Sequence, residues 1–348
     1  MMKYYLLGVS KCAKLNQSIN IGDYIQALAS SQFLPHIDGF LDRDEDLKRY
    51  DGEKCKMIMN GWYMHNPVNW PPSNKIDPLF VAFHLNPLAQ KEMTSKESIA
   101  YLKSHQPIGC RDKHTASLLQ SYGVESYFSG CMTLTLGLKY QKKETNGKVY
   151  FVDPQVSLKK NKILKWLESS FYWLKHPLTC SKLFLNDNAF RDTSKKRRFL
   201  IVAKFINDYS KLFPMRLLKE AVYVSHQSIY YYNNFTTDED RFEEAKRLVS
   251  EYSKASLVIT SRIHCALPCL GIGTPVIYTA LEGDSFISTS RMNGLIDLFN
   301  VIQCSEKGLK PMFNIQLPID GKNHPSNKND WKPLAKSLIE RCKNFINK

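Results

Sequence analysis

Short apolar runs alternate with amphipathic segments through the first part of the chain. The runs lie at residues 3–9, 57–59, 79–83, 107–110 and 127–128, and their composition is typical of buried strands. Helical spacing follows at residues 22–28, 98–103 and 113–122, where Gly123 ends the last helix. Strands that alternate with helices in this order predict a doubly wound α/β domain.

A second series of this kind starts after residue 147. Strands are predicted at residues 148–153 and 221–225, and a long charged helix at 238–254. The next stretch, LVITSRIHCALPCLGIGTPVIY at residues 257–278, contains two apolar runs and a short helix that ends at Gly271 and Gly273. We therefore expect two doubly wound Rossmann-like domains that face a cleft, at residues 1–146 and 147–330. A last helix, at 331–348, is expected to pack back toward the N-terminal domain.

A basic amphipathic insert at about residues 156–220 interrupts this alternation. One apolar stripe recurs every three or four residues, at Leu164, Leu167, Phe171, Leu174 and Leu178. Residues 141–220 contain 18 Lys+Arg and 7 Asp+Glu, so this segment contributes +11 to the chain's net charge of +15. A partner with an acidic surface explains such a concentration better than a basic active site does. The apolar run at residues 199–203 fits a strand and a helix equally well.

The stripe has two interpretations. Either it packs on the second domain, or it lies in the interface of an anionic membrane, where lysines and tryptophans commonly flank an apolar helix face. No apolar run approaches the ~20 residues that a membrane-spanning helix needs. The opening apolar run is shorter than a signal-peptide core, and the nine cysteines include no C-x-x-C pair. We expect a cytoplasmic protein, which the second interpretation places peripherally at the inner face of the cell membrane.

Polar side chains gather where the predicted strands end. Ser261, Arg262, Ile263 and His264 follow the apolar run at residues 257–259 and open the next helix. A helix N-terminus presents unpaired N–H groups and the positive end of a dipole. With a guanidinium and an imidazole beside it, such an N-terminus suits a phosphate or a carboxylate. A structural interpretation is equally open: a cap at Ser261, a surface ion pair at Arg262 and a buried histidine.

Other candidates lie at the corresponding edges of the predicted sheets, because parallel strands present ligand-binding residues at their carboxyl ends. Asp23 fits either a catalytic base or an acid that stabilises the helix N-terminus. The remaining candidates, all for substrate binding, are Asn20, Gly22, Asn60, His84, Arg111, His226 and Arg291.

Four stretches of the chain, taken in order, resemble the polysaccharide pyruvyl transferase family. They are Asn20-Ile21-Gly22-Asp23, Gly109-Cys110-Arg111-Asp112, Ser129-Gly130-Cys131-Met132-Thr133, and SRIHCALPCLGIGTPVIY from Ser261 onward. The resemblance implies a GT-B-like architecture of two Rossmann-like domains. The last stretch departs from the family pattern at Ile263, where leucine is usual, and at Cys265, where glycine is usual. Cys265 narrows the space beside His264, and the basic insert lies outside all four stretches.

Members of this family transfer the three-carbon unit of phosphoenolpyruvate onto two hydroxyls of a sugar as a ketal, and release phosphate. The resemblance therefore implies a phosphoenolpyruvate donor, bound by Arg262, Arg111 and the Ile263–His264 backbone. It also implies a sugar acceptor in a polysaccharide or its lipid-linked precursor. His264 is then the general acid, with a pKa raised by the bound dianion, and Asp23 is the general base. This scheme requires neither a metal nor a cofactor.

Two other functions fit parts of the sequence. A glycosyltransferase of the same fold would bind nucleotide phosphates at the same helix, with Arg291, and a ribose at Glu282. A nucleic-acid-binding protein would use the basic insert. However, no recognised nucleic-acid module is present, and the aromatic residues of the insert accompany an amphipathic stripe. We therefore expect no nucleic-acid partner.

Overall fold

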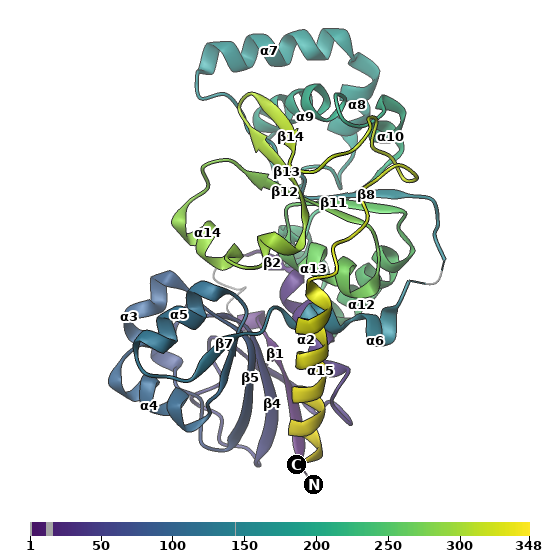
Figure 1. The fold of residues 1–348 in the computed structure, drawn as a ribbon. Coiled ribbons are helices and arrows are strands. Elements are labelled where there is room, and N and C mark those ends of the chain that lie inside the picture. The colour runs from purple at the N-terminus through teal and green to yellow at the C-terminus, as the bar shows by residue number, and fades with distance from the viewer. Residues whose placement is uncertain (1, 12–16, 143) are drawn as a thin grey trace.

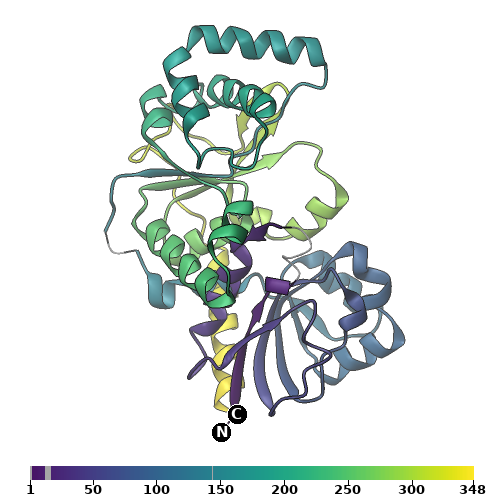
Figure 2. The same ribbon diagram turned by 180° about the vertical axis from the view of Figure 1, so that it is seen from behind.

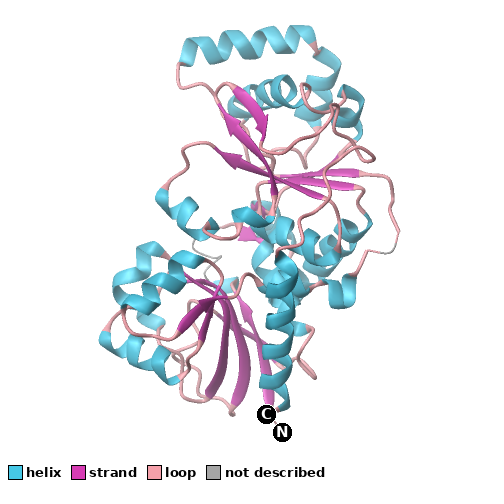
Figure 3. Cartoon of the chain, in the orientation of Figure 1, coloured by secondary structure: helices cyan, strands magenta, loops and turns pink. Residues whose placement is uncertain are grey.

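The computed structural model describes residues 2–11, 17–142 and 144–348 of the chain. It has a mixed α/β structure with two six-stranded, mainly parallel sheets, one from each half of the sequence (Figure 1, Figure 3). This arrangement confirms the predicted pair of Rossmann-like units. Among the described residues, no helix is both long enough and apolar enough to cross a membrane.

The first sheet has the strand order β3-β1-β4-β5-β6-β7, and its strands are parallel. They are β1 Lys3–Gly8, β3 Gly39–Asp42, β4 Cys55–Tyr63, β5 Ile76–Leu85, β6 Ile108–Cys110 and β7 Ser126–Phe128. β4 and β5 are the long central strands, and their nearly continuous burial explains their apolar composition. The sequence pattern does not predict β3, because its four residues form no distinct apolar run.

The second sheet has the strand order β14-β13-β12-β11-β8-β9, and only β14 is antiparallel to its neighbour. Its strands are β8 Val149–Val152, β9 Val222–Val224, β11 Leu257–Thr260, β12 Val276–Leu281, β13 Asn300–Ser305 and β14 Gly308–Pro311. β11 pairs with β12 on one side and β8 on the other, so the helix that follows β11 starts near the middle of the sheet edge.

Helices cover both sheets. In the first half they are α2 Ile21–Ser31, α3 Gln90–Met93, α4 Lys96–Ser104, α5 Lys113–Ser121 and α6 Gly137–Tyr140, with a 3-10 turn η3 at Met132–Thr135. In the second half they are α7 Lys162–Lys175, α8 Pro177–Leu185, α9 Lys195–Tyr209, α10 Met215–Glu220, α11 Ile229–Asn234, α12 Asp238–Lys254, α13 Ile263–Ile272, α14 Phe286–Met292 and α15 Trp331–Asn347.

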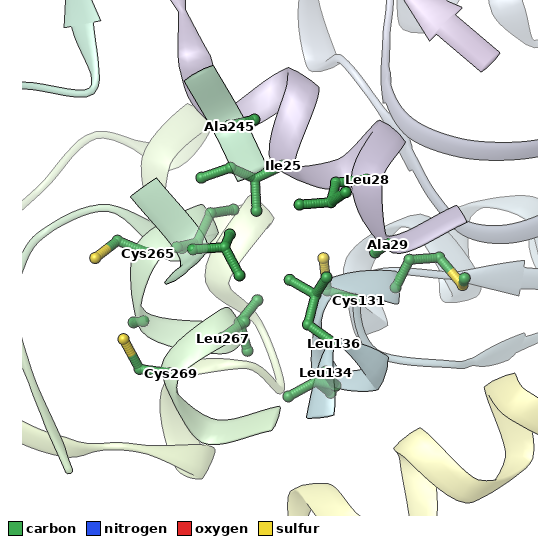
Figure 4. Packing of buried hydrophobic residues seen from close by; sticks show 14 of the residues in the cluster. Ile25, Leu28, Ala29, Cys131, Leu134, Leu136, Ala245, Cys265, Leu267 and Cys269 are labelled. Carbon is green, nitrogen blue, oxygen red and sulfur yellow. The ribbon is translucent and has the colours of Figure 1, made fainter. Parts of the chain in front are cut away.

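The two halves share one hydrophobic core. α2 packs on α12 and α13, although it follows the first strand of the other half. Figure 4 shows Ile25 and Leu28 of α2 in the same cluster as Leu134 of η3 and Leu267 of α13. A backbone pairing adds to this contact, because β2 (Ile19–Asn20) pairs antiparallel with β10 (Gln227–Ser228). The shared core brings the N-terminus of α2 against the N-terminus of α13.

The chain passes from the first sheet to the second between Phe128 and Val149, and this interval contains residue 146. The C-terminal helix α15 returns to the first half, where it contacts η3 and β5 (Figure 1). There the Lys56 Nζ donates a hydrogen bond to the Phe345 carbonyl at 2.8 Å. The last helix is therefore part of the first half in space although it is remote in sequence.

The basic insert folds into α7, α8, α9 and α10. Residues 199–203, which fit either a strand or a helix in sequence, lie in α9. This helix buries Phe205 and Tyr209 against Phe151 of β8, with ring centroids 5.5 and 5.7 Å from that ring. α7 packs on α9 and lies outermost, at the end of the molecule farthest from the first sheet (Figure 1, Figure 2).

Candidate active site

The turn after β11 is fixed by hydrogen bonds to the neighbouring strand. The Thr260 hydroxyl donates to the Val152 carbonyl at 2.8 Å, and its oxygen accepts the Arg262 backbone N–H at 2.9 Å. Helix α13 then starts at Ile263 and ends where Gly273 adopts a left-handed conformation with φ of 90°. Arg262 is the N-cap residue, and its side chain makes no capping hydrogen bond. The first backbone N–H groups of α13 are therefore not capped by that side chain.

Arg262 forms an ion pair with Asp153, a partner that the sequence did not reveal. Its Nε donates to Asp153 Oδ2 at 2.7 Å, and the same oxygen accepts the His226 backbone N–H at 2.9 Å. The Ser261 hydroxyl donates to the Asp153 carbonyl at 2.6 Å. Arg262 is thus oriented through Nε, and in the described structure its Nη groups have no protein partner. The surface-ion-pair interpretation of Arg262 and a role in anion binding are both compatible with this geometry.

His264 lies in the first turn of α13 against Gly22 of α2. A Cβ placed on Gly22 would lie 2.8 Å from His264 Cβ, so only glycine allows the two helices to approach this closely. The imidazole is 6% exposed, and its Nε2 lacks a hydrogen-bond partner within the described residues. Burial lowers the pKa of His264 well below its usual value, and the nearby Arg111 and Arg291 lower it further. The imidazole is therefore neutral in the ligand-free protein.

Asp23 occupies the first turn of α2, after the N-cap Asn20, whose Oδ1 accepts the Gly22 N–H at 3.1 Å. The capping role thus belongs to Asn20. The Gln26 Nε2 donates to Asp23 Oδ1 at 3.1 Å, and Arg43 Nη1 lies 3.8 Å from the same oxygen. Burial raises the pKa of Asp23, while Arg43 and Arg111 oppose this shift. Asp23 is therefore a half-buried carboxyl group, with its side chain 19% exposed, close to two cations.

Arg111 follows β6, and its position is fixed by a backbone hydrogen bond to the Phe83 carbonyl at 2.9 Å. Its side chain is 1% exposed, yet Nε and Nη2 have no partner in the described part of the chain. Burial lowers the pKa of Arg111 to about 10, with a further contribution from Arg291. A buried guanidinium with unpaired N–H groups is costly, because it has lost its hydration without gaining an acceptor. An anionic ligand would supply that acceptor.

His84 near the end of β5 forms a buried pair with Asp112, the N-cap of α5. Nδ1 of His84 lies 2.5 Å from Asp112 Oδ2, and Oδ1 of this carboxylate accepts the Thr115 N–H at 2.8 Å. Burial, with a contribution from Arg111, lowers the pKa of His84 to about 4. Burial acts to raise the pKa of Asp112, but the hydrogen bonds from His84 and Thr115 and the charge of Arg111 together outweigh it, and the pKa is lowered. The neutral imidazole therefore donates from Nδ1, and its Nε2 keeps a lone pair with no protein partner.

Beside α13 lies a cavity of about 520 Å³, lined by Arg262, Ser261, Thr279, Arg291 and, from α5 of the other half, His114. Helix α5 also contacts a residue of the cavity lining, because the Lys113 N–H donates to the Asn293 carbonyl at 3.0 Å. Arg291 lies in α14, and its charge lowers the pKa values of His84, Arg111 and His264. Arg291 is thus electrostatically close to all three.

Two predicted substrate ligands have structural partners instead. Asn60 is 3% exposed, accepts a hydrogen bond from the Ser30 hydroxyl at 2.6 Å and donates one to the Gln26 carbonyl at 3.1 Å. It joins β4 to α2. His226 is fully buried with Nε2 2.7 Å from the Tyr252 hydroxyl, and burial lowers its pKa to about 4. Its carbonyl accepts the Ile21 N–H at 2.8 Å, which connects the two halves.

Some of the buried polar atoms without partners lie in the predicted site. Twelve such side-chain atoms occur among the described residues, and four of them belong to His84, Arg111 and His264. Sequence reasoning missed Arg43, Asp112 and Asp153, which pair with Asp23, His84 and Arg262. Asp112 belongs to the stretch Gly109-Cys110-Arg111-Asp112 that resembles the family, and this resemblance could have identified it. No sequence feature indicated Arg43 or Asp153. The described residues contain no group of three or more His, Cys, Asp or Glu side chains arranged to hold a metal ion.

The family model of the polysaccharide pyruvyl transferases matches residues 20–282. This range begins at Asn20 and includes His84, Arg111 and the complete turn and helix around His264. No curated protein and no solved structure matches the chain. The matched range covers 263 of the 348 residues and contains the buried site at the start of α13. The chain therefore belongs to the polysaccharide pyruvyl transferase family.

Proposed function

We propose that the protein transfers the pyruvyl unit of phosphoenolpyruvate onto a sugar of a polysaccharide, or of its lipid-linked precursor, as a ketal. The observation that carries this proposal is the buried guanidinium of Arg111, which has unpaired N–H groups and lowers the pKa values of two imidazoles, His84 and His264. A dianionic donor would pair with the guanidinium and face both imidazoles.

Phosphoenolpyruvate carries a phosphate and a carboxylate, so its site needs cations from more than one direction. Arg111 supplies one from the first half, and Arg291 and Arg262 supply two from the second half. The backbone N–H groups at Ile263 and His264 add the positive end of the α13 dipole. Guanidinium groups suit both anions, because their N–H groups bind carboxylate and phosphate oxygens in pairs.

Ketal formation begins with transfer of a proton to the methylene carbon of the donor. This gives a methyl group and an oxocarbenium-like carbon, which the first sugar hydroxyl attacks while a base takes the hydroxyl proton. The bond between this carbon and the phosphate oxygen then breaks, and the second hydroxyl attacks the new oxocarbenium centre. Of the two protons lost by the sugar hydroxyls, one balances the proton that the acid gave to the methylene carbon. The other is released with the phosphate.

His264 is the proposed acid, although it is neutral in the free protein. Binding of a dianion between Arg111 and Arg291 would offset the two charges that lower the pKa of His264, and a hydrogen bond from Nε2 to that anion would favour the imidazolium. The donor would then bind together with a proton. Donor binding and activation of the acid are therefore one linked event in this scheme.

Two residues are candidates for the base. Asp23 remains the proposed base, and its raised pKa makes it a stronger proton acceptor than an exposed aspartate. His84 is a second candidate, because Asp112 holds it in the tautomer that leaves Nε2 as an acceptor. Asp23→Asn and His84→Gln distinguish them, since loss of the base lowers kcat by roughly 10²-fold or more while loss of a neighbouring polar group does not.

The test is an assay of phosphate release with phosphoenolpyruvate and a panel of bacterial polysaccharide fragments and lipid-linked oligosaccharides. Release should require both substrates, and mass spectrometry should detect a pyruvate ketal on the acceptor. His264→Gln should retain donor binding and lower turnover by roughly 10²-fold or more. Sugar transfer from a nucleotide sugar, with no reaction of phosphoenolpyruvate, would instead establish a glycosyltransferase.

A further inference from the structure

The apolar stripe of the basic insert is exposed. Along α7, Leu167 is 64% exposed, Phe171 58% and Leu174 83%, and the stripe continues onto α8 with Leu178 at 76%. Further members of the same surface are Ile163, Leu164 and Leu185, which are 51% to 75% exposed. On a helix with ~100° of rotation per residue, the members on α7 fall within an arc of about 100°. We call these seven residues the apolar face: Ile163, Leu164, Leu167, Phe171, Leu174, Leu178 and Leu185.

The opposite side of α7 already has a packing partner. Trp173 stacks on Phe199 of α9 with ring centroids 4.8 Å apart, and its Nε1 donates to the Phe199 carbonyl at 3.1 Å. Trp166 also stacks on the Phe199 ring, with the ring centroids 5.6 Å apart. The buried Ser169 lies on this inner side as well. The tryptophans rather than the stripe therefore hold the helix to the second half, and the first of the two sequence interpretations does not describe this chain.

Basic side chains surround the apolar face. Residues 156–198 contain 11 Lys+Arg and 3 Asp+Glu, a net charge of +8. The cations next to the apolar face include the exposed Lys160, Lys162, Lys175 and Lys182. Beside α7 an open cavity of about 500 Å³ is lined by Lys162, Lys165, Lys196 and Arg197, together with Trp166. Four cations around one open cavity suit the phosphate groups of lipids.

The position of α7 makes this surface accessible to a flat partner. The helix lies across the end of the molecule, and both views of the chain show no other element beyond it (Figure 1, Figure 2). Its exposed side points away from α9, on which it packs. The apolar face and its lysines can therefore meet a planar surface without displacement of any other element.

We propose that α7 and α8 form a membrane-interface surface that attaches the protein to an anionic lipid bilayer. The apolar face would enter the boundary between headgroups and acyl chains, and the surrounding lysines and arginines would contact the headgroup phosphates. Each cation near an anionic leaflet strengthens the attachment by about fivefold, so several together produce reversible binding. This proposal does not depend on the identity of the donor, because the surface lies outside the candidate active site.

Vesicle co-sedimentation tests the proposal with the full chain. Vesicles of phosphatidylcholine with phosphatidylglycerol should bind the protein at low salt, and binding should weaken as salt is added. Vesicles of phosphatidylcholine alone should bind it at least tenfold less. Phe171→Ser with Leu174→Ser should lower the partition coefficient at least tenfold. The matched control is Val68→Ser with Leu88→Ser, which removes two apolar side chains that are 68% and 78% exposed elsewhere, and it should leave binding unchanged.

A second pair of variants tests the charge. Lys196→Gln with Arg197→Gln should weaken binding at least fivefold, whereas Lys332→Gln with Lys336→Gln on α15 should not. Thermal unfolding of every variant separates loss of binding from loss of folding. Protein that stays in the supernatant with anionic vesicles at low salt overturns the proposal, as does equal binding to neutral vesicles. A dimer in light scattering that Phe171→Ser with Leu174→Ser dissociates also overturns it, because a second copy then covers the apolar face.

Discussion

Arg111 carries its charge where water does not reach it. The native fold keeps this guanidinium 1% exposed with two unpaired nitrogens, which lowers stability unless a ligand completes its hydrogen bonds. We therefore propose that Arg111 serves ligand binding rather than folding. The same reasoning applies to His84 and His264, whose Nε2 atoms are buried and have no partner among the described residues.

The first prediction follows from the buried, unpaired charge of Arg111. Arg111→Met should leave the free energy of unfolding unchanged or raise it by about 1–2 kcal/mol, because the variant removes an uncompensated buried charge. Binding of phosphoenolpyruvate should weaken by about 1.5–3 kcal/mol, the value of a hydrogen bond to a charged group. Urea unfolding and calorimetry measure the two quantities. Arg49→Met, at a side chain 71% exposed, is the control that should change neither.

Loss of stability in Arg111→Met together with full donor affinity would mean that Arg111 has a structural role. Its partners would then be sought among the protein groups nearby.

The positions of individual residues were predictable where the sequence itself places them at the end of a strand. Arg111, His84 and His264 follow or end apolar runs, so their location at the sheet edge could be read from the pattern. The residues with which such side chains pair could not be read from the pattern. His84 lies 28 positions from Asp112, and Arg262 lies 109 positions from Asp153, so each contact depends on which strands are neighbours. The pKa of His264 depends in the same way on cations from three separate elements.

At the scale of elements, the contact of α2 with α13 determines where His264 lies. Gly22 makes this contact possible, because a side chain there would meet His264 Cβ at 2.8 Å and Asn20 Oδ1 at 3.0 Å. His264 Cβ is fixed by the backbone of α13, and Asn20 Oδ1 can move only with loss of its hydrogen bond to the Gly22 N–H. The close spacing of α2 and α13 therefore depends on glycine at residue 22.

We predict that Gly22→Ala destabilises the protein by about 1–3 kcal/mol, the usual cost of an extra group in a packed interface. It should also lower turnover, because His264 would be displaced from the anion site. Chemical denaturation and the phosphate-release assay provide the measurements. Unchanged stability would show that α2 and α13 adjust to the methyl group without strain, and would remove Gly22 from the site.

The secondary structure was predictable where the apolar residues of an element have a distinct spacing and a particular residue, such as glycine, marks its end. α13 has an apolar sequence between two strands and a glycine at its C-terminus, and its position was predicted from these features. Residues 199–203 are a short apolar run with neither feature, so sequence could not separate strand from helix; packing of α9 on β8 decides it. The exposed apolar face of α7 has the same sequence period as a buried one. Only the packing of Trp166 and Trp173 shows which side faces inward.

At the scale of the whole molecule, buried neutral histidines make folding sensitive to acid. Burial lowers the pKa values of His84 and His226 to about 4, below the usual 6.5, whereas the unfolded chain protonates at its ordinary value. Below pH 6.5 the unfolded state therefore binds more protons, and the stability contributed by these residues is lost as the pH falls toward about 4. Each contributes at most about 3 kcal/mol over this window.

We predict a decline in the free energy of unfolding between pH 6.5 and about 4, measured by urea denaturation. His84→Gln should make the decline shallower, because one proton fewer is then taken up on unfolding. The control is His36→Gln, at a histidine whose side chain is 41% exposed. An equal slope in wild type and His84→Gln would mean that His84 is not kept neutral by the fold.

The shared core also decides how the two halves cooperate. Each six-stranded sheet comes from one half of the sequence, but β2 pairs with β10 in a separate two-stranded sheet, and α15 returns to the first half, so the halves are joined by both contacts. The strand series in the sequence predicted two units, but the connections between them depend on contacts with no local signature. The site lies where these connections meet, between residues of both halves.

The most direct test of the account is calorimetric titration of phosphoenolpyruvate into the protein near pH 7, in two buffers with different heats of ionisation. We predict binding with uptake of about one proton, since the donor dianion converts the neutral His264 into the acid that the reaction needs. His264→Gln should still bind the donor but take up no proton. Absence of binding, or the same proton uptake in His264→Gln, would contradict the proposed site and the proposed acid.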